Sequence, residues 1–446
     1  MASTYLSMTG TGDAKKWTFS GWFKKALNGS EQRLITSSDN STYDDNIRFN
    51  SDDTITIRYR NAVVLKTNRK FRDNNAYYHI VVKVDTDQST ANDRVVLYIN
   101  GVDERTVGGY GTDSMPGQSL TGYLNFNVTY IGFTNPSANS NHFNGIMSHV
   151  HFTDGYAYDA SAFGSTDSTT GEWKINTSPS VTYGANGFFI LKDGNSVTDQ
   201  SGEGNDFTVG GGTLTKTEDN PSNVFATLNP LAQTTTKGTL SNGNLTYDRA
   251  GSSDNWVTVF GTEAFTQGKY YYEYKIIDGG SSAGNGSIVG LINYDISDIQ
   301  NKSLTHIGGN SGDGGMGWYG AGNLFTSSGD QGIFSNYTDG DIVMIAVDAD
   351  NGYVYWGKNN SWINSGDPTS GSTGTGGFVL SLAGSNGTYC FGVSHREGGN
   401  GTANFGNGYF GTTAVSSAGT NASGNGIFEY DVPTGFTALS TKGLNL

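Results

Sequence analysis

The chain has 446 residues, of which 35% are hydrophobic and 12% aromatic, and its formal net charge is −15. This length corresponds to two or three domains, and the acidic balance without a basic patch argues against a nucleic-acid partner. No apolar run approaches the roughly 18 residues of a membrane span, and the first residues lack the apolar core of a secretion signal. The single cysteine, Cys390, excludes an intramolecular disulfide.

The first half of the chain is a series of short strand patterns separated by glycine-rich turns. Residues 54–60 (TITIRYR) alternate two isoleucines and a tyrosine with polar side chains, the two-residue period of a half-buried strand. Residues 94–104 (RVVLYINGVDE) read as a strand closed by an Asn-Gly turn, the pair that favours a tight hairpin. These patterns predict a β-sandwich.

Two of the six histidines lie in one of these strands, in the segment GIMSHVHF. Alternation along a strand would place Met147, His149 and His151 on one face, and Val150 and Phe152 on the other. A zinc site needs three or four ligands, and the remaining four histidines are scattered along the chain. We therefore interpret the pair as part of a structural strand.

A composition shift near residues 210–245, with Pro221 and Pro230 and little periodicity, marks a boundary. Strand patterns then return in KYYYEYKII, SIVGLINY, DIVMIAVDADNGYVYWGK and TYCFGVS. The predicted fold class is all-β, with two β-sandwich domains of jelly-roll type in tandem and little helix. The expected boundaries are a first sandwich over 1–215, a linker over 216–240, a second sandwich over 241–412 and an irregular C-terminal tail over 413–446.

The first half contains YLSMTGTGDAKKWTFSGWFK, YYHIVVKVDTDQSTANDRVVLYINGVDE and FNGIMSHVHFTDGYAYDASAFG, in this order. This series resembles the concanavalin A-like (laminin-G-like) lectin and glucanase sandwich, and VTDQSGEGNDFTV is similar to its terminal segment. The longer block HVHFTDGYAYDASAFGSTDSTTGEWKINTSPSVTYGANGFFI, followed by SGEGNDFTV and EDNPSNVFATLNPL, is similar to a recurring block of bacteriophage virion proteins.

The second half contains GKYYYEYKI, GLINYD, DGDIVMIAVDADNGYVYWGKNN and ANFGNGYF, in this order. This series resembles a SPRY domain, which is itself a β-sandwich. The segment NNSWINSGDPTSGSTGTGG is similar to phage versions of that domain. The resemblances imply the fold and a virion context, and they supply no catalytic residue.

Glycan-cleaving enzymes of the concanavalin-like class need clustered carboxylates on one strand. The one Glu-x-Asp pair of this sequence, Glu429 and Asp431, lacks a third carboxylate and lies in the expected tail. A Gly-x-Ser-x-Gly pattern at 280–284 and a Gly-x-Gly-x-x-Gly pattern at 315–320 lack the helix that a nucleophile elbow or a phosphate loop requires. We therefore expect no enzymatic activity and no cofactor.

Acidic side chains gather in the loop DGNSVTDQSGEGND. Asp193, Asp199 and Asp206 are the cation candidates of the sequence, because hard cations prefer several carboxylates and carbonyls. The alternative is a solvated turn, and we expect no bound metal. The segment DADNGYVYW imitates the start of a calcium loop, but its twelfth position is Asn359 rather than glutamate.

Aromatic residues in two loops of the second half are the candidates for ligand contact. Trp318 and Tyr319 lie in GDGGMGWYGAGNLF, and Trp362 lies in KNNSWINSGDP. Exposed aromatic rings supply contact area at low entropic cost. The alternative is that these rings pack into the core of the second sandwich.

These observations lead to one functional expectation and two alternatives. We expect a non-enzymatic structural protein of the phage particle surface, in a tail fibre, tip or capsid decoration. Its partners would be other virion proteins and a host-surface glycan or protein, with no nucleic acid, no membrane insertion and a homo-oligomeric assembly. The alternatives are a lectin or glycan-active enzyme of the concanavalin A-like class and a bacterial adhesin.

Overall fold

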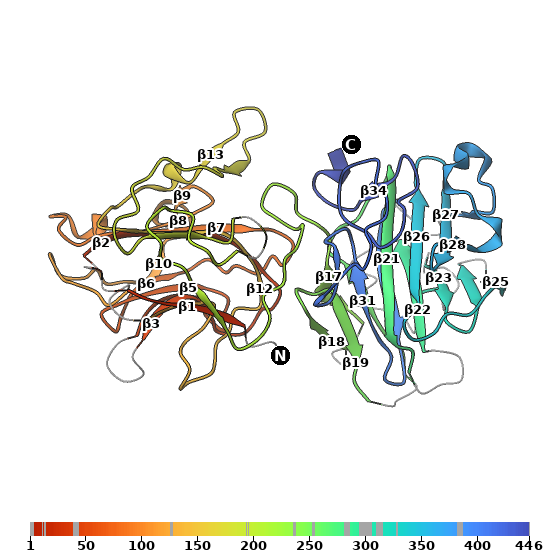
Figure 1. Cartoon of the computed structure of the whole chain (residues 1–446), viewed down its shortest axis with the longest axis horizontal. Coiled ribbons are helices and arrows are strands. Elements are labelled where there is room, and N and C mark those ends of the chain that lie inside the picture. Colours follow the sequence, from red (N-terminus) through yellow and green to blue (C-terminus); the bar gives the residue numbers. More distant parts are fainter. Residues whose placement is uncertain are drawn as a thin grey trace. The chain divides into compact units, whose positions relative to one another are not determined.

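The fold is described from a computed structural model. The structure describes residues 4–10, 12, 15–38, 44–124, 128–192, 194, 196–234, 238–251, 255–280, 286–293, 306–308, 315–326, 329–380 and 387–445. The chain divides into two compact units, Met1–Lys216 and Thr217–Leu446 (Figure 1). Strands account for 45% of the structure and helix for 6%, which confirms the predicted all-β class.

Within its described residues, the first unit has two large antiparallel sheets, drawn as an upper and a lower layer in Figure 1. The eight-stranded sheet has the order β10 (Tyr110–Asp113), β6 (Ala62–Thr67), β5 (Ile55–Tyr59), β4 (Asp44–Phe49), β3 (Gln32–Ser38), β11 (Val128–Ile131), β1 (Tyr5–Thr9), β16 (Thr208–Gly210). The six-stranded sheet has the order β15 (Phe188–Ile190), β12 (Gly145–Asp154), β2 (Lys16–Lys25), β7 (Tyr78–Asp85), β8 (Val95–Ile99), β9 (Val102–Asp103).

Smaller elements complete the first unit. A two-stranded sheet joins β13 (Gly164–Thr166) and β14 (Trp173–Ile175). The helical segments are α1 (Glu104–Val107) and the 3₁₀ turns Ala91–Asp93 and Ala160–Ala162. Among the described residues of the chain, no helix has the length and apolar character needed to cross a lipid bilayer.

The core of the first unit lies between its two large sheets. Strand β2 shows how the sequence forms it: Trp17, Phe19 and Phe23 point into the core, where they meet aliphatic side chains of the opposite sheet. The intervening Ser20 and Trp22 point to the other face of the sheet, yet they are also buried. Strand β2 is therefore buried on both faces, and its outer face needs a cover.

The cover is the segment 155–183, and buried histidines connect it to the sheet. Trp173 donates its Nε1–H to Nδ1 of His79 (2.9 Å), so the other ring nitrogen carries the hydrogen and donates to the hydroxyl of Ser20 (2.9 Å). Nδ1 of His151 pairs with the hydroxyl of Tyr183 (2.9 Å). Burial lowers the pKa of His79 to about 3 and holds the pKa of His151 well below its ordinary value.

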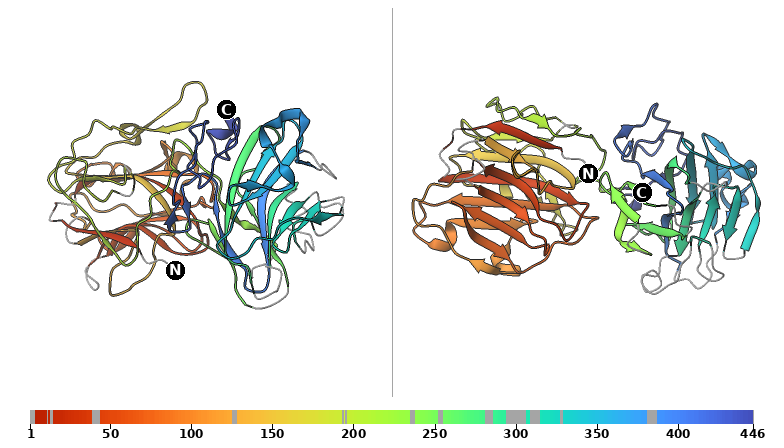
Figure 2. Two further views of the ribbon diagram at one scale, coloured as in Figure 1. Left: turned by 45° about the vertical axis from the view of Figure 1, so that its right-hand side comes forward. Right: turned by 90° about the horizontal axis from the view of Figure 1, so that it is seen from below.

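The second unit is also a two-sheet sandwich, and Figure 2 shows it in two further views. Within its described residues, the seven-stranded sheet has the order β17 (Leu228–Gln233), β20 (Val257–Gly261), β30 (Tyr389–His395), β22 (Ser287–Asn293), β23 (Met316–Tyr319), β24 (Asn323–Thr326), β25 (Gly329–Ile333). The other sheet has the order β18 (Gly238–Ser241), β19 (Thr246–Arg249), β31 (Asn400–Asn404), β21 (Lys269–Asp278), β26 (Ile342–Asp348), β27 (Tyr353–Lys358), β28 (Ser361–Trp362).

Shorter pieces attach to these sheets. Strand β29 (Phe378–Val379) pairs with β27, β34 (Thr437–Ala438) pairs with β21, and β32 (Tyr409–Phe410) pairs with β33 (Thr413–Ala414). The 3₁₀ turns are Ile363–Ser365, Pro368–Thr373 and Gly443–Asn445. The core between the sheets is rich in aromatic side chains, and Tyr272, Trp318 and Trp356 are all fully buried in it.

The predicted boundaries of the second sandwich are wrong at both ends. Residues 216–240 were expected to be a linker, but from Thr217 onward they belong to the second unit and include β17 and part of β18. Residues 413–446 were expected to be an irregular tail outside the sandwich. Residues 413–445 are largely irregular, but β34 and several buried apolar side chains place them on the outer face of the β21–β26–β27 sheet. That face is itself apolar, so it requires a cover.

A buried carboxylate fixes this C-terminal segment to the sheet. Glu273 on β21 is fully buried and accepts hydrogen bonds from the backbone N–H groups of Glu429 and Tyr430, both 2.9 Å long. The hydroxyl of Tyr271 (3.0 Å) and the amide of Asn404 (3.2 Å) are its other donors. Burial nevertheless raises the pKa of Glu273 to about 7.

We predict that the C-terminal segment contributes to the stability of the second unit. Phe436 of this segment is 1% exposed, so Phe436→Ala should lower the free energy of unfolding by about 3–5 kcal/mol. Leu444 in the same segment is 42% exposed, and Leu444→Ala should change it by about 0.5 kcal/mol or less. Urea denaturation of the full chain measures both, and equal effects would contradict the packing of Phe436.

We also predict that the first unit weakens on acidification. The pKa of His79 is lowered on folding, so below the ordinary value of 6.5 the unfolded chain binds a proton that the folded chain does not. The contribution of His79 to the free energy of unfolding is therefore complete above pH 6.5, and it is lost as the pH falls from 6.5 towards 3. His79→Gln should reduce the slope of unfolding free energy against pH, between pH 5 and 6, by about 1.4 kcal/mol per pH unit. An unchanged slope in calorimetry at these pH values would refute this role.

Candidate functional site

The two histidines of β12 lie in a strand with an irregular register. The pairing of β12 with β2 shifts between Ser148 and His151, and His149 has a φ of 48°. Because of this bulge, Met147 packs against the core together with Val150, so the predicted grouping of Met147 with the histidines is wrong. The ring of His151 stacks on Phe189 with 3.9 Å between ring centres.

The acidic loop is organised by hydrogen bonds. Asp199 accepts from the backbone N–H groups of Phe189 (2.8 Å) and Ser201 (2.9 Å) through one oxygen. Its other oxygen accepts from the hydroxyl of Ser201 (2.6 Å) and the N–H of Asn205 (2.9 Å). Asp206 accepts from the backbone N–H of Asp199 (2.7 Å), and Asp193 lies outside the described residues.

This arrangement is a turn held by Asp199 rather than an assembled set of ligands. Among the described residues of the chain, no three His, Cys, Asp or Glu side chains are grouped closely enough to hold a metal ion.

Strand β23 separates the first two aromatic candidates by its two-residue period. Trp318 points into the core between the sheets, where it is fully buried and meets Tyr337 edge to face at 5.1 Å. Tyr319 points to the opposite face and is half-buried. The prediction that Trp318 contacts a ligand is therefore wrong, because its ring is enclosed by the core. The ring of Tyr319 remains partly accessible.

Tyr319 belongs to an aromatic cluster on the outer face of the seven-stranded sheet. The cluster consists of Trp256, His306, Tyr319, Phe325 and Arg396, all of them half-buried. The ring of Trp256 meets those of His306 (5.0 Å) and Tyr319 (5.8 Å) edge to face. The ring of Phe325 lies 5.7 Å from His306 and 6.2 Å from Tyr319.

Arg396 joins the rings of the aromatic cluster. Its guanidinium lies 4.9 Å from the centre of the Trp256 ring and 5.7 Å from that of Tyr319, and it donates to the Tyr319 hydroxyl (2.6 Å). Such cation–π contacts hold the rings in fixed orientations. The arrangement presents ring surfaces and a charged donor side by side, which suits contact with a sugar ring or with protein side chains.

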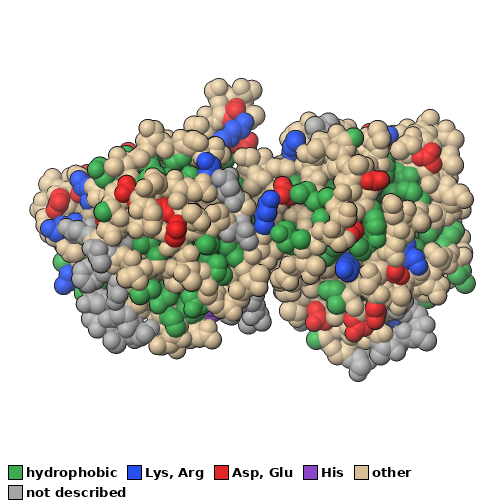
Figure 3. Space-filling model, in the orientation of Figure 1, with side chains coloured by type: hydrophobic (Ala, Val, Ile, Leu, Met, Phe, Trp, Pro, Cys, Tyr) green, Lys and Arg blue, Asp and Glu red, His purple; other side chains and the backbone are tan. Residues whose placement is uncertain are grey.

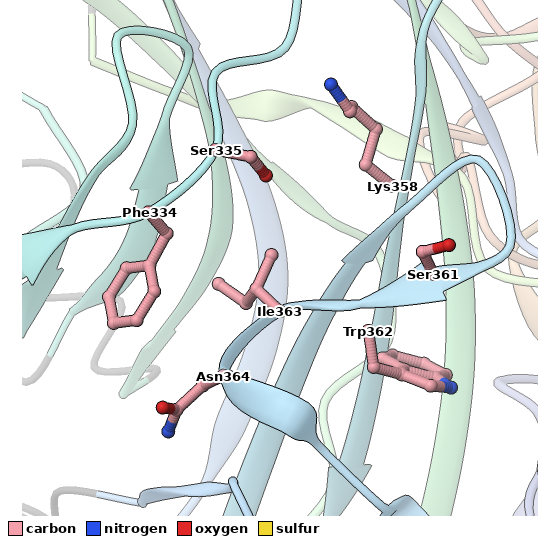
Figure 4. Close-up of a pocket in the computed structure, with 7 residues that line it drawn as sticks. All are labelled: Phe334, Ser335, Lys358, Ser361, Trp362, Ile363 and Asn364. Atoms are coloured by element: carbon pink, nitrogen blue, oxygen red, sulfur yellow. The ribbon is translucent and has the colours of Figure 1, made fainter.

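Trp362 lies apart from the aromatic cluster, at a shallow pocket of about 280 Å³. The pocket is lined by Phe334, Ser335, Lys358, Ser361, Trp362, Ile363 and Asn364 (Figure 4). Trp362 and the adjacent Ile363 point in different directions in Figure 4, and Ile363 belongs to the core between the sheets. Trp362 is half-buried and packs against the side chains beneath the C-terminal segment. It therefore combines a packing role with a partly exposed edge.

The other four members of the aromatic cluster were not identified from the sequence. They come from four separate segments, and only the pairing of β20, β30, β22, β23 and β24 brings them to one face. No local spacing connects Trp256 with Arg396. The adjacent aromatic residues Trp318 and Tyr319 in a glycine-rich stretch were the one signal that the sequence carried.

One family model matches the chain. Residues 2–161 match the concanavalin A-like lectin/glucanases superfamily, so the match lies within the first unit. The sheet arrangement and this match agree that the first unit has a concanavalin A-like fold. A comparison with curated proteins found no match.

Solved structures similar to the chain include SPRY domains. The SPRY domain of human HERC1 is 15% identical, with 40% of this chain and 96% of that chain covered and a TM-score of 0.30. A second human SPRY domain is 16% identical, with 37% and 94% covered and a TM-score of 0.26. A proposed carbohydrate binding protein from Bacteroides ovatus is 15% identical, with 48% and 57% covered and a TM-score of 0.31.

We predict that neighbouring residues of β23 respond differently to truncation. Trp318→Ala should lower the free energy of unfolding by about 3–5 kcal/mol, because it empties a core position. Tyr319→Ala should lower it by less than about 2 kcal/mol, because the ring is half-buried and its contacts are edge-to-face and cation–π pairs. Chemical denaturation of the two variants measures the difference, and a larger effect for Tyr319 would show that its ring is structural.

Proposed function

We propose that the protein is a non-enzymatic structural component of a bacteriophage particle surface, in a tail fibre, a tip or a capsid decoration. Its sandwiches would contact other virion proteins and bind a host-surface glycan or protein. The proposal draws its virion context from the sequence blocks that resemble phage proteins. Its location would be the surface of the particle.

The observation that carries the proposal is the aromatic cluster. Buried tyrosine, phenylalanine and tryptophan side chains already fill the core of the second unit, yet five further residues hold a half-exposed, charged and aromatic surface on its outer face. Contact surfaces of proteins are enriched in tryptophan, tyrosine and arginine. The cluster therefore supports a role in binding.

The use of the carboxylates supports a role without catalysis. Glu273 and Asp199, on different units, accept four hydrogen bonds each from groups of their own fold. A glycosidase instead holds two carboxyl groups on either side of the bond that it cleaves. On this proposal the protein requires no cofactor.

A lectin is the second candidate function. The observation that favours it is the family match over residues 2–161, whose description includes lectins and glucanases. A glycan array probed with the full chain tests this candidate. Hydrolysis of a bound glycan, measured as the release of reducing ends, would identify the protein as an enzyme rather than a lectin.

We further propose that the protein acts as a symmetric homo-oligomer, because most soluble oligomers have closed symmetry and surface components of particles are present in several copies. Light scattering of the purified chain measures the assembly. This part of the proposal would be contradicted if the chain is a monomer in solution and if particles also carry it as isolated single copies.

The virion assignment is tested on particles. Antibody raised against the full chain should label the surface of purified phage particles in electron micrographs. Tyr319→Ala should reduce adsorption of the particles to host cells at least fivefold, with a melting temperature close to that of the wild type. Tyr409→Ala, which changes a half-buried tyrosine of the same unit outside the cluster, should leave adsorption unchanged. Unlabelled particles would refute the virion role, and normal adsorption of Tyr319→Ala would refute the role of the cluster.

A further inference from the structure

Three arginines lie on adjacent strands of the eight-stranded sheet of the first unit. Arg33 on β3 is the direct partner of Arg48 on β4, and Arg58 on β5 is the direct partner of Asn46 on β4. Asn46 and Arg48 are two residues apart, so they share one face of the sheet. The apolar partners Ile35 and Ile47 lie on the opposite, core-facing side. The three guanidinium groups therefore extend from the face turned away from the core.

Two carboxylates connect these arginines. Glu31 contacts Arg33 (3.0 Å) and Arg48 (3.6 Å), and Asp44 contacts Arg33 (3.3 Å) and Arg58. We call these five residues the arginine site. Two other carboxylates on or beside β4 and β5 have their own partners: Asp52 pairs with Lys66, and Asp45 accepts from the backbone N–H groups of Asn61 and Tyr123.

The charges of the arginine site do not balance. Three guanidinium groups share two carboxylates, and the positive charge of each arginine repels the charges of the other two. The Nε–H groups of Arg33 and Arg58 are buried and have no acceptor among the described residues. A buried donor without an acceptor costs stability. The excess of one positive charge is what an added anion would neutralise.

The site is also reachable from solvent. The side chain of Arg58 is 25% exposed and that of Arg48 is 15% exposed, whereas Arg33 lies beneath them at 6%. One neutral side chain lies beside the guanidinium groups: Oδ1 of Asn50 accepts from Arg48 (3.0 Å), and its Nδ2 donates to the buried hydroxyl of Thr56 (2.8 Å).

We propose that the arginine site binds the oxyanion of an acidic polysaccharide, a carboxylate or sulfate carried on a sugar chain. Guanidinium groups recognise such oxyanions through paired N–H donors, and the half-buried side-chain oxygen of Asn50 beside them suits a hydroxyl group of the sugar. The net charge of −15 opposes a densely charged polymer such as nucleic acid, so a ligand with widely spaced charges is favoured.

This inference goes beyond the proposed function, because it places a second contact site on the other unit. The aromatic cluster and the arginine site share no residue. The Tyr319→Ala variant should therefore bind an acidic oligosaccharide as the wild type does. If the arginine site fails its test, the labelling and adsorption experiments on the aromatic cluster remain independent of that result.

The experiment is isothermal titration calorimetry of the full chain with three tetrasaccharides at 50 mM salt. Tetragalacturonate carries carboxylates, a chondroitin sulfate tetrasaccharide carries sulfates as well, and maltotetraose is neutral. We expect binding of at least one acidic tetrasaccharide, weakened by 300 mM salt, and no binding of maltotetraose. Binding of tetragalacturonate identifies the carboxylate as sufficient, and binding of the chondroitin sulfate fragment alone identifies the sulfate.

Two matched variants locate the binding. Arg58→Gln should weaken binding at least tenfold. Arg105→Gln should leave it within twofold, although Arg105 is an ion-paired arginine of the same unit with a similarly exposed side chain, 27% against 25%. Equal weakening by both variants would overturn the proposal, because it would mean that diffuse charge rather than this site attracts the ligand. The proposal would also be overturned if neither of the two acidic tetrasaccharides binds.

A measurement on the wild type covers the case in which Arg58→Gln does not fold. Phenylglyoxal modifies exposed arginines, and the bound tetrasaccharide should protect the peptides that contain Arg48 and Arg58 but not the one that contains Arg105. Lack of this protection would overturn the proposal. Binding of single-stranded DNA with the same dependence on Arg58 would replace the polysaccharide with a nucleic acid and would equally overturn it.

Discussion

A β-sheet that buries both of its faces must have cover on the side away from the core, and this constraint organises both units. Strand β2 in the first unit and strand β21 in the second are buried on both sides. The segment 155–183 covers the first, and the C-terminal segment covers the second. Each sandwich is therefore a three-layer structure, in which an irregular segment replaces the third sheet or helix layer.

An irregular segment forms few backbone hydrogen bonds with the sheet that it covers. Individual side-chain hydrogen bonds must therefore attach the segment to the sheet. His79 accepts from Trp173 in the first unit, and Glu273 accepts from two backbone N–H groups in the second. Both groups are buried and polar, and both are satisfied by the covering segment. On the face shown in Figure 3, by contrast, charged side chains are scattered singly among hydrophobic and other side chains. Polar groups thus serve as attachment points inside and as solvated surface outside.

The sequence predicted the strands well because alternation is a local property. It did not predict the bulge near His149, since one inserted residue reverses the faces that follow and leaves no mark in composition. The covering role of residues 413–446 was missed because Phe428, Val432 and Phe436 are spaced four residues apart as in a helix, but Pro433 and Gly435 between them are typical of a loop. The aromatic cluster and the arginine site depend on strand order, which short-range patterns do not contain; of their members only Tyr319 was named in advance.

The two ends of the second unit meet. The backbone of Ala226 donates to Leu439, the residue pair Phe225 and Ser440 forms a bridge, and Val224 bonds Thr441 across a separation of 217 residues. Contacts of such long sequence separation close late in folding, because the loop entropy must be overcome first. During synthesis, the chain emerges with its C-terminal residues last. The second unit can therefore complete its fold only after Thr441 has left the ribosome, whereas the first unit has every residue that it needs once Lys216 has left it.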